Sequence, residues 1–196
     1  MYNYQKIEEH ILNYLKNSLN ENLYYHGIHH THEVMENALE IAKAENLNEE
    51  DTLLLKIAVL YHDAGLVDSY TGHEEAGCVK VKAFLPEFQV SDKDIEIICG
   101  MIRATKIPQT PHNILEKILA DADLKYLGTN KFEDIGNTLF KELKIYANII
   151  SENQWFEIQK SFLEKHHFHT DYCIKKYEGA KQENLKKVIE HLASLG

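Results

Sequence analysis

Four side chains in three separated stretches of the sequence have the types that bind divalent metal ions: His30, the adjacent pair His62 and Asp63, and Asp123. Imidazoles and carboxylates are common ligands of borderline divalent metals. The pair lies at the end of the segment TLLLKIAVLYHDAG, in which Lys56 is the only charged residue before it. As a helix, this segment is apolar almost all round and therefore buried. Because an unpaired carboxylate is costly to bury, the pair needs either a metal ion or a dense hydrogen-bond network.

The elements that must position these residues are predicted to be helices. Apolar residues recur at helical spacing, and a hydrophobic content of 44% with only nine glycines and three prolines favours an all-α fold. Gly65, Gly72, Gly128 and the loop 106–111 mark breaks between elements. We expect helices near residues 4–19, 30–45, 51–63, 73–85, 91–104, 112–126, 131–149, 152–168 and 171–194.

Composition limits the classes of function. A chain of 196 residues is most simply one domain. The start of the chain has no signal-peptide character and no run is long and uncharged enough to span a bilayer, so we expect a cytoplasmic protein without a membrane partner. The net charge of −10 argues against binding of extended nucleic acid. A small anionic substrate would need a local positive centre, which a bound metal supplies.

Helical spacing also predicts which side chains point inward. His30 shares one face of its predicted helix with the apolar Val34 and Ala38, so we expect it to face the core. His29 and His32 should face away, because adjacent positions on a helix diverge by about 100°.

Two aspartates lie close together in the stretch ADADLKYLG. Asp123 is one turn beyond Leu119 on the core face, whereas Asp121 lies one turn from both Lys117 and Lys125. We therefore predict that Asp123 is the buried carboxylate of the site and that Asp121 is a solvated ion-pair partner.

These residues resemble the HD-domain metal-dependent phosphohydrolases. The defining set of that family is a His at the start of one helix, a His-Asp pair at the end of the next and a distant Asp, which resemble His30, His62–Asp63 and Asp123. The stretches AVLYHDAGL, ILADADLKYLG and FHTDYCIKKYEGAKQENLKKV are also similar to segments of family members. The resemblance covers the chain from about Tyr25 onward. It implies a single compact helical HD-domain fold of about eight helices over residues 1–196, with a core at about 25–128 and the C-terminal helices 131–194 packed on it.

The resemblance implies roles for further residues. YHGIHHTHEV is similar to the signature of cyclic-nucleotide phosphodiesterases, in which the His at the place of His30 binds metal and the His at the place of His26 protonates the leaving group. A capping or surface position beside Gly27 is the alternative for His26. The implied enzyme is a metal-dependent phosphoric ester hydrolase, in which the ion lowers the pKa of water towards about 7. Asp63 and Asp123 would anchor the ion and accept a proton.

Other positions bear on a second ion and on phosphate binding. Two-metal family members have a further His after the central pair, a place that His73 can fill, although a core position satisfied by a backbone carbonyl is the alternative. Glu74 beside it is a further candidate for the second site or its surroundings, although a solvated acid at a helix N-terminus is the favoured role. Thr105 stands where such members have a His, so we expect one firmly held ion. Arg103, the single arginine beside twenty lysines, is a candidate catalytic phosphate ligand, with an ordinary surface position as its alternative.

The implied substrate is a small phosphorylated molecule, either a monoester or a diester and most simply a nucleotide. Tyr25, Tyr126 and Phe168 are candidates for stacking on a base. The ligand types accept Mn, Fe, Mg, Co, Ni or Zn according to availability. Two alternatives stay open: a non-catalytic HD module that senses a nucleotide, and a di-iron oxygenase, which the Thr105 position disfavours.

Overall fold

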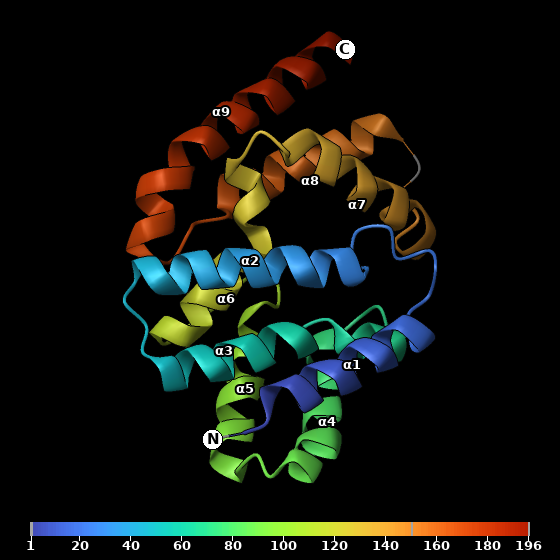
Figure 1. The fold of residues 1–196 in the computed structure, drawn as a ribbon. Helices are drawn as coiled ribbons and strands as arrows, with labels where there is room; N and C mark the ends of the chain where they lie inside the picture. The colour runs from blue at the N-terminus through green and yellow to red at the C-terminus, as the bar shows by residue number, and fades with distance from the viewer. Residues whose placement is uncertain (1, 150, 196) are drawn as a thin grey trace.

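The computed structural model describes residues 2–149 and 151–195, and every regular element in these ranges is helical (Figure 1). The all-α prediction is confirmed, with nine α-helices and three short 3-10 turns in the described ranges. The elements are α1 (Tyr4–Ser18), α2 (Ile28–Ala44), α3 (Glu49–Tyr61), η1 (Ala64–Val67), α4 (His73–Phe84), η2 (Leu85–Phe88), α5 (Asp92–Ala104), α6 (Ile114–Leu124), η3 (Lys125–Gly128), α7 (Phe132–Tyr146), α8 (Glu152–Lys165) and α9 (Asp171–Leu195).

Capping side chains fix where several helices begin. The side chains of Asn48, Ser91, Asn113 and Ser151 each accept a hydrogen bond from a backbone N–H in the first turn of the helix that follows. Such bonds satisfy amides that have no partner within the helix. The predicted boundaries are therefore close to the observed ones, since the chain carries a local start signal at each place.

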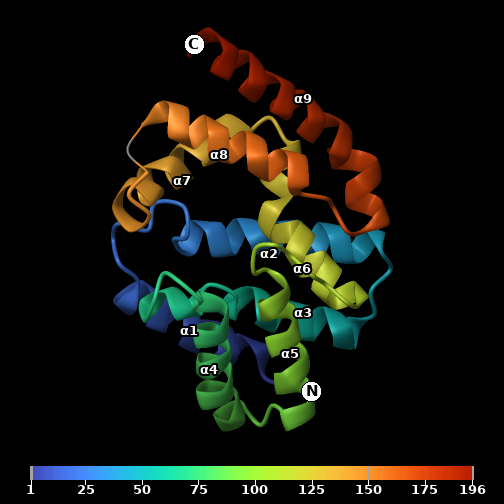
Figure 2. The same cartoon turned by 180° about the vertical axis from the view of Figure 1, so that it is seen from behind.

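The helices form two groups on either side of α2. Figures 1 and 2 show α1, α3, α4 and α5 on one side of α2 and the pair α7–α8 on the other, with α9 running along the outside. A large hydrophobic cluster joins α1 to α6, and a smaller one lies where η3 meets α7, α8 and α9. No helix in the described part of the chain is long and apolar enough to cross a membrane.

A close approach of η1 to α4 sets the geometry of the central pair. A Cβ atom on Gly65 would lie 2.0 Å from the carbonyl oxygen of His73 and 2.5 Å from the backbone nitrogen of Gly77. Only glycine permits this contact, because any side chain would overlap the backbone of α4. The contact brings Asp63, just before η1, and His73, at the start of α4, to the same place.

Glu40 on α2 fastens α9 and η3 to the core. Its carboxylate accepts hydrogen bonds from Lys125 Nζ at 2.8 Å, Tyr172 Oη at 2.5 Å, Tyr177 Oη at 2.7 Å and Lys176 Nζ at 2.9 Å. Burial by itself would raise the pKa of Glu40, but these four donors hold that pKa well below its ordinary value. The ionised form is therefore the one that the folded state stabilises.

We expect Glu40→Gln to lower the free energy of unfolding at pH 7 by about 1 kcal/mol, a figure discounted for solvent screening of a carboxylate that is 37% exposed. The pKa of Glu40 is lower in the folded than in the unfolded state. Its contribution is therefore present above about pH 4.5 and is lost as the pH falls towards the lower folded-state value. Urea unfolding at pH 7 and under acid conditions should show that the difference in free energy of unfolding between wild type and Glu40→Gln becomes smaller at low pH. Glu36→Gln, at an exposed position of the same helix, is the matched control. A difference between wild type and Glu40→Gln that does not change with pH would contradict the expectation.

Candidate metal centre

Three of the predicted ligands converge from three helices. Ligand atoms of His30, His62 and Asp123 all lie within 4.8 Å of one another. His30 Nε2 is 3.0 Å from Asp123 Oδ1, and His62 Nε2 is 3.8 Å from the same oxygen. His30 lies in the first turn of α2, His62 caps α3 and Asp123 lies in the last turn of α6. As predicted, His30 is buried, whereas His29 and His32 are exposed.

Asp63 completes the cluster and leaves two buried atoms without a hydrogen-bond partner. Its Oδ2 is 3.2 Å from His62 Nε2 and 3.7 Å from His30 Nε2. Neither Oδ2 nor His62 Nε2 makes a hydrogen bond with any residue that the structure describes. His62 Nδ1 lies 2.7 Å from the carbonyl oxygen of Val59, so Nδ1–H is the donor and, in the neutral imidazole, the lone pair on Nε2 faces the cluster. Buried lone pairs that converge in this way fit a divalent cation.

The electrostatics of the cluster also favour a cation. Burial opposes the charged form of His62, but Asp63 and Asp123 raise the pKa of His62 to about 9. Burial likewise opposes ionisation of Asp63, but His62 and His26 hold the pKa of its carboxyl below the ordinary range. Asp63 is thus anionic, and a divalent cation bound here would displace the proton of His62.

His73 and Glu74 lie on the other side of Asp63. His73 Nε2 is 3.6 Å from Asp63 Oδ1 and 3.9 Å from Glu74 Oε1, and its Nδ1 lies 3.1 Å from the carbonyl oxygen of Tyr70. Glu74 is buried, so its predicted solvated position was wrong: α4 packs closely on η1, and its first two residues, His73 and Glu74, line the cavity. Thr105 is also buried, and its hydroxyl donates to the carbonyl oxygen of Ile102.

A buried glutamate that the sequence analysis did not identify holds His26. Glu142 on α7 is fully buried, and its Oε1 lies 2.5 Å from His26 Nδ1. Its carboxylate also accepts hydrogen bonds from the backbone N–H groups of Tyr25 and His26, at 2.9 and 3.2 Å, and from Tyr70 Oη at 2.9 Å. Burial by itself would raise the pKa of Glu142, but its bond with His26 lowers that pKa. An ionised Glu142 requires Nδ1 of His26 to be the donor, which leaves Nε2 for the cavity.

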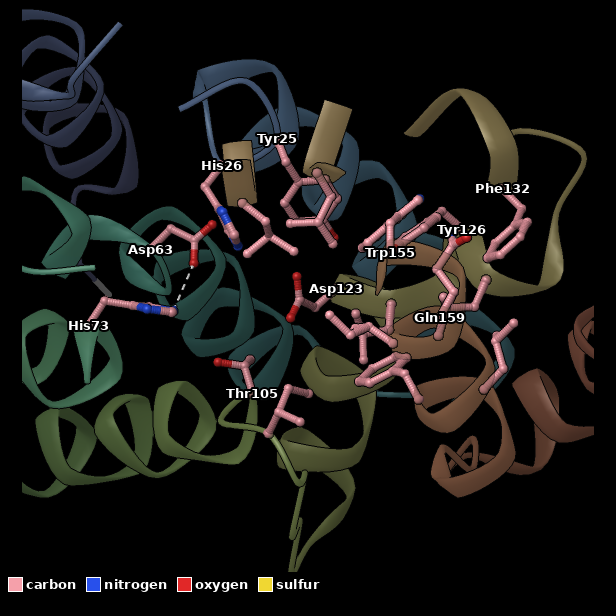
Figure 3. Close-up of a pocket in the computed structure, with 18 of the residues that line it drawn as sticks. Tyr25, His26, Asp63, His73, Thr105, Asp123, Tyr126, Phe132, Trp155 and Gln159 are labelled. Carbon is pink, nitrogen blue, oxygen red and sulfur yellow. Dashed lines mark ion pairs between the residues drawn. The ribbon is translucent and has the colours of Figure 1, made fainter. Parts of the chain in front are cut away.

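The cluster lies at one end of a cavity of about 380 Å³. His26, Asp63, His73 and Thr105 line this end, and Figure 3 shows Asp123 between them and a second end formed by aromatic side chains. The rings of His30 and His73 are each 5.9 Å from the ring of His26. The arrangement can thus place a cation, a carboxylate and an imidazole around one small group.

Comparison with known proteins identifies the family. The HD-domain model matches residues 27–125, about half of the chain. The chain belongs to the HD-domain family. A solved structure described as a predicted HD superfamily hydrolase, from an uncultured Thermotogales bacterium, is 24% identical, with 96% of this chain and 92% of that one covered and a TM-score of 0.62. A protein of Lactobacillus plantarum is 15% identical, with 96% and 98% covered and a TM-score of 0.67. These likenesses are of fold, and no curated protein matches the chain.

The matched HD segment contains only part of the site. His30, His62, Asp63 and Asp123 all lie within residues 27–125. His26 just precedes that segment, and Glu142 follows it on α7. The wall of the cavity that α7 and α8 provide therefore belongs to this HD protein's C-terminal part.

Arg103 lies apart from the cavity. Its Nε and Nη2 atoms donate to the two carboxylate oxygens of Glu75, at 2.6 and 3.1 Å, and its side chain is 40% exposed. Arg103 is not one of the residues that line the cavity. The structure therefore places Arg103 at the surface position considered as its alternative, because an exposed acid on α4 already occupies the guanidinium.

We expect Arg103→Ala to leave the kcat and KM of any hydrolysis that the protein catalyses within about twofold of wild type, because Arg103 does not line the cavity. The protein should also stay folded, since an exposed ion pair contributes only about 0–1 kcal/mol to stability. Steady-state kinetics and a thermal melt of Arg103→Ala beside Glu75→Ala, which removes the other half of the pair, provide the measurement. A fall in kcat for Arg103→Ala but not for Glu75→Ala would show that the guanidinium reaches the substrate.

Proposed function

We propose that this HD domain is a metal-dependent phosphohydrolase that cleaves a phosphomonoester or phosphodiester of a small molecule with water as the nucleophile. The observation that carries the proposal is the buried His/Asp cluster, whose His62 Nε2 and Asp63 Oδ2 converge without a hydrogen-bond partner among the described residues. The fold neighbour described as a predicted HD superfamily hydrolase adds support.

The residues of the chain have distinct parts in such a reaction. His30, His62, Asp63 and Asp123 would hold the cation. When bound, a divalent ion such as Mn, Fe, Mg, Co, Ni or Zn polarises a phosphoryl oxygen and makes water more acidic. Asp63 can accept the proton that the attacking water releases, because its carboxyl is ionised and its Oδ1 faces the cavity side occupied by His73.

His26 is the group suited to protonate the departing oxygen. Its Nδ1 is fixed by Glu142, so the ring cannot turn freely, and its Nε2 is left for the cavity. The side chain is 17% exposed, which keeps bulk water from most of the ring. Burial by itself would lower the pKa of His26, but Asp63 and Glu142 raise it, so Nε2 can carry the proton that passes to the departing oxygen.

The test is a metal analysis followed by a phosphoester screen. Protein purified with and without oxygen is analysed for bound metals, and then each metal is paired with a panel of phosphomonoesters and phosphodiesters. We expect release of phosphate or alcohol that is abolished in His62→Ala and Asp63→Ala but retained in His29→Ala, an exposed histidine two residues after Gly27.

The other outcomes of the screen are informative. Protein that holds a metal but hydrolyses no member of the panel would overturn the proposal. Nucleotide binding without turnover would support the sensing alternative, and two irons per chain in anaerobic protein would support the oxygenase alternative.

A further inference from the structure

The cavity continues from the metal cluster into an apolar chamber. Beyond Asp123 it runs between η3, α7 and α8, where the smaller hydrophobic cluster lies. Figure 3 shows His26, Asp63 and His73 at one end and Phe132, Trp155 and Gln159 at the other. A molecule with its reacting group at the cluster has its remainder in this chamber.

The walls of the chamber are mostly apolar. No lysine or arginine among the described residues lines the cavity, and beyond the metal cluster the described lining offers few polar groups, namely the amide of Gln159, the hydroxyls of Tyr25 and Tyr126 and the indole N–H of Trp155. A sugar with its hydroxyls, a base or a second phosphate would lose water here and gain few hydrogen bonds, which is costly. The chamber side chains that carry this inference are Phe132, Leu139, Leu143, Trp155, Ile158 and Phe162.

We infer that the substrate is a phosphomonoester of a bulky apolar alcohol, with its phosphate at the His/Asp cluster and its apolar group in the chamber between α7 and α8. The inference rests on the proposed phosphohydrolase function and specifies its substrate class. Removing apolar surface from water is favourable in proportion to the area buried, and a cavity of about 380 Å³ lies within the range of small-molecule sites. The inferred substrate thus differs from the expected nucleotide in its hydrophobic leaving group.

The single tryptophan of the chain makes binding directly measurable. Trp155 lines the chamber and its ring is stacked on Phe140, with centroids 5.4 Å apart. Titration of n-octylphosphonate and of methylphosphonate into the protein, with the metal that it retains on purification, should change the fluorescence of Trp155 only with the octyl compound. We expect its Kd to be at least tenfold lower than that of methylphosphonate measured by calorimetry.

Hydrolysis gives a second, independent measurement. n-Octyl phosphate, ribose 5-phosphate and thymidine 5′-phosphate are all monoesters of primary alcohols, so their leaving groups are chemically alike. We expect kcat/KM for n-octyl phosphate to exceed the other two values at least tenfold.

Matched substitutions locate the effect in the chamber. Leu143→Gln and Ile158→Gln place an amide in its wall, and Ile158 is 40% exposed, so the change is compatible with folding. Ile145→Gln is the control, because Ile145 is 49% exposed on α7 and does not line the cavity. We expect the first two, combined, to raise the Kd of n-octylphosphonate at least tenfold and Ile145→Gln to leave it unchanged, with thermal melts to verify folding.

The outcomes separate this inference from the proposed function. Equal affinity for the octyl and methyl compounds, or preferred hydrolysis of thymidine 5′-phosphate, would overturn the substrate class while leaving phosphohydrolase activity intact. Tight binding of n-octylphosphonate by a protein that hydrolyses no phosphoester would overturn the function and leave the ligand class standing. The comparison of ligands on the wild-type protein decides the matter even if a variant fails to fold.

Discussion

Asp123→Asn should release the bound metal and lower kcat/KM by about 10³-fold, since a metal ion supplies several kcal/mol of transition-state stabilisation and 1.36 kcal/mol corresponds to a factor of ten. In the absence of metal, the Asp123→Asn protein should be as stable to unfolding as the metal-free wild-type protein. Asp123 Oδ1 contacts His30 and His62 at 3.0 and 3.8 Å, and its side chain is 14% exposed. An amide of the same shape fills the same space but provides a poorer metal ligand. Metal content, kcat/KM and urea unfolding of the metal-free protein are the measurements.

Asp121→Asn, two residues earlier, should have the opposite effects. Asp121 is fully buried and accepts hydrogen bonds from the backbone N–H groups of His169 and Thr170, both at 2.8 Å, and from Thr170 Oγ1 at 2.6 Å. An asparagine offers one acceptor oxygen in place of two, so we expect a loss of about 3 kcal/mol of stability with metal content unchanged. Metal retention by Asp123→Asn, or metal loss by Asp121→Asn in a folded protein, would contradict this assignment.

The contrast between the two aspartates shows what helical spacing could and could not predict. Spacing correctly directed Asp123 towards His30, but the prediction that Asp123 is the buried aspartate and Asp121 the solvated one, paired with Lys117 and Lys125, was wrong: Asp121 is fully buried and Asp123 is only partly buried. The segment before α9 covers the side of α6 that carries Asp121, and Lys125 pairs with Glu40 instead. Spacing identifies the face of a helix on which a residue lies, whereas the element that covers this face comes from 48 residues away.

Glu142 is a second case of this limit. It lies three residues beyond Leu139 and seven beyond Ile135, on the half-buried face that α7 turns towards the smaller cluster. The sequence feature that could have indicated a buried acid here is a glutamate on the apolar face of an amphipathic helix. The acid is stable there only because Tyr25, His26 and Tyr70 supply its donors, and no local pattern indicates that contact across 116 residues. The helices themselves were predictable because their breaks and caps are local.

His26→Ala is expected to lower kcat by about 10²-fold, the lower end of the contribution typical of a general acid. KM and metal content should stay near wild type, because His26 is not a member of the group of mutually close ligand atoms. Activity against a substrate whose leaving group needs no proton, such as a nitrophenyl ester, should fall far less. An equal loss for both kinds of ester would show that His26 does not protonate the leaving group.

Glu142→Gln tests whether the glutamate acts through His26. The amide retains the size of the side chain but lacks the charge that orients the Nδ1–H group, so we expect kcat to fall about tenfold with KM unchanged. Tyr70→Phe removes a different bond of Glu142 and should have little effect. In the double variant with His26→Ala, kcat should be no lower than in His26→Ala alone, because residues that act as one unit are not additive. Independent losses that multiply would instead assign Glu142 a purely structural role, since the fall in kcat would then not depend on the imidazole that it holds.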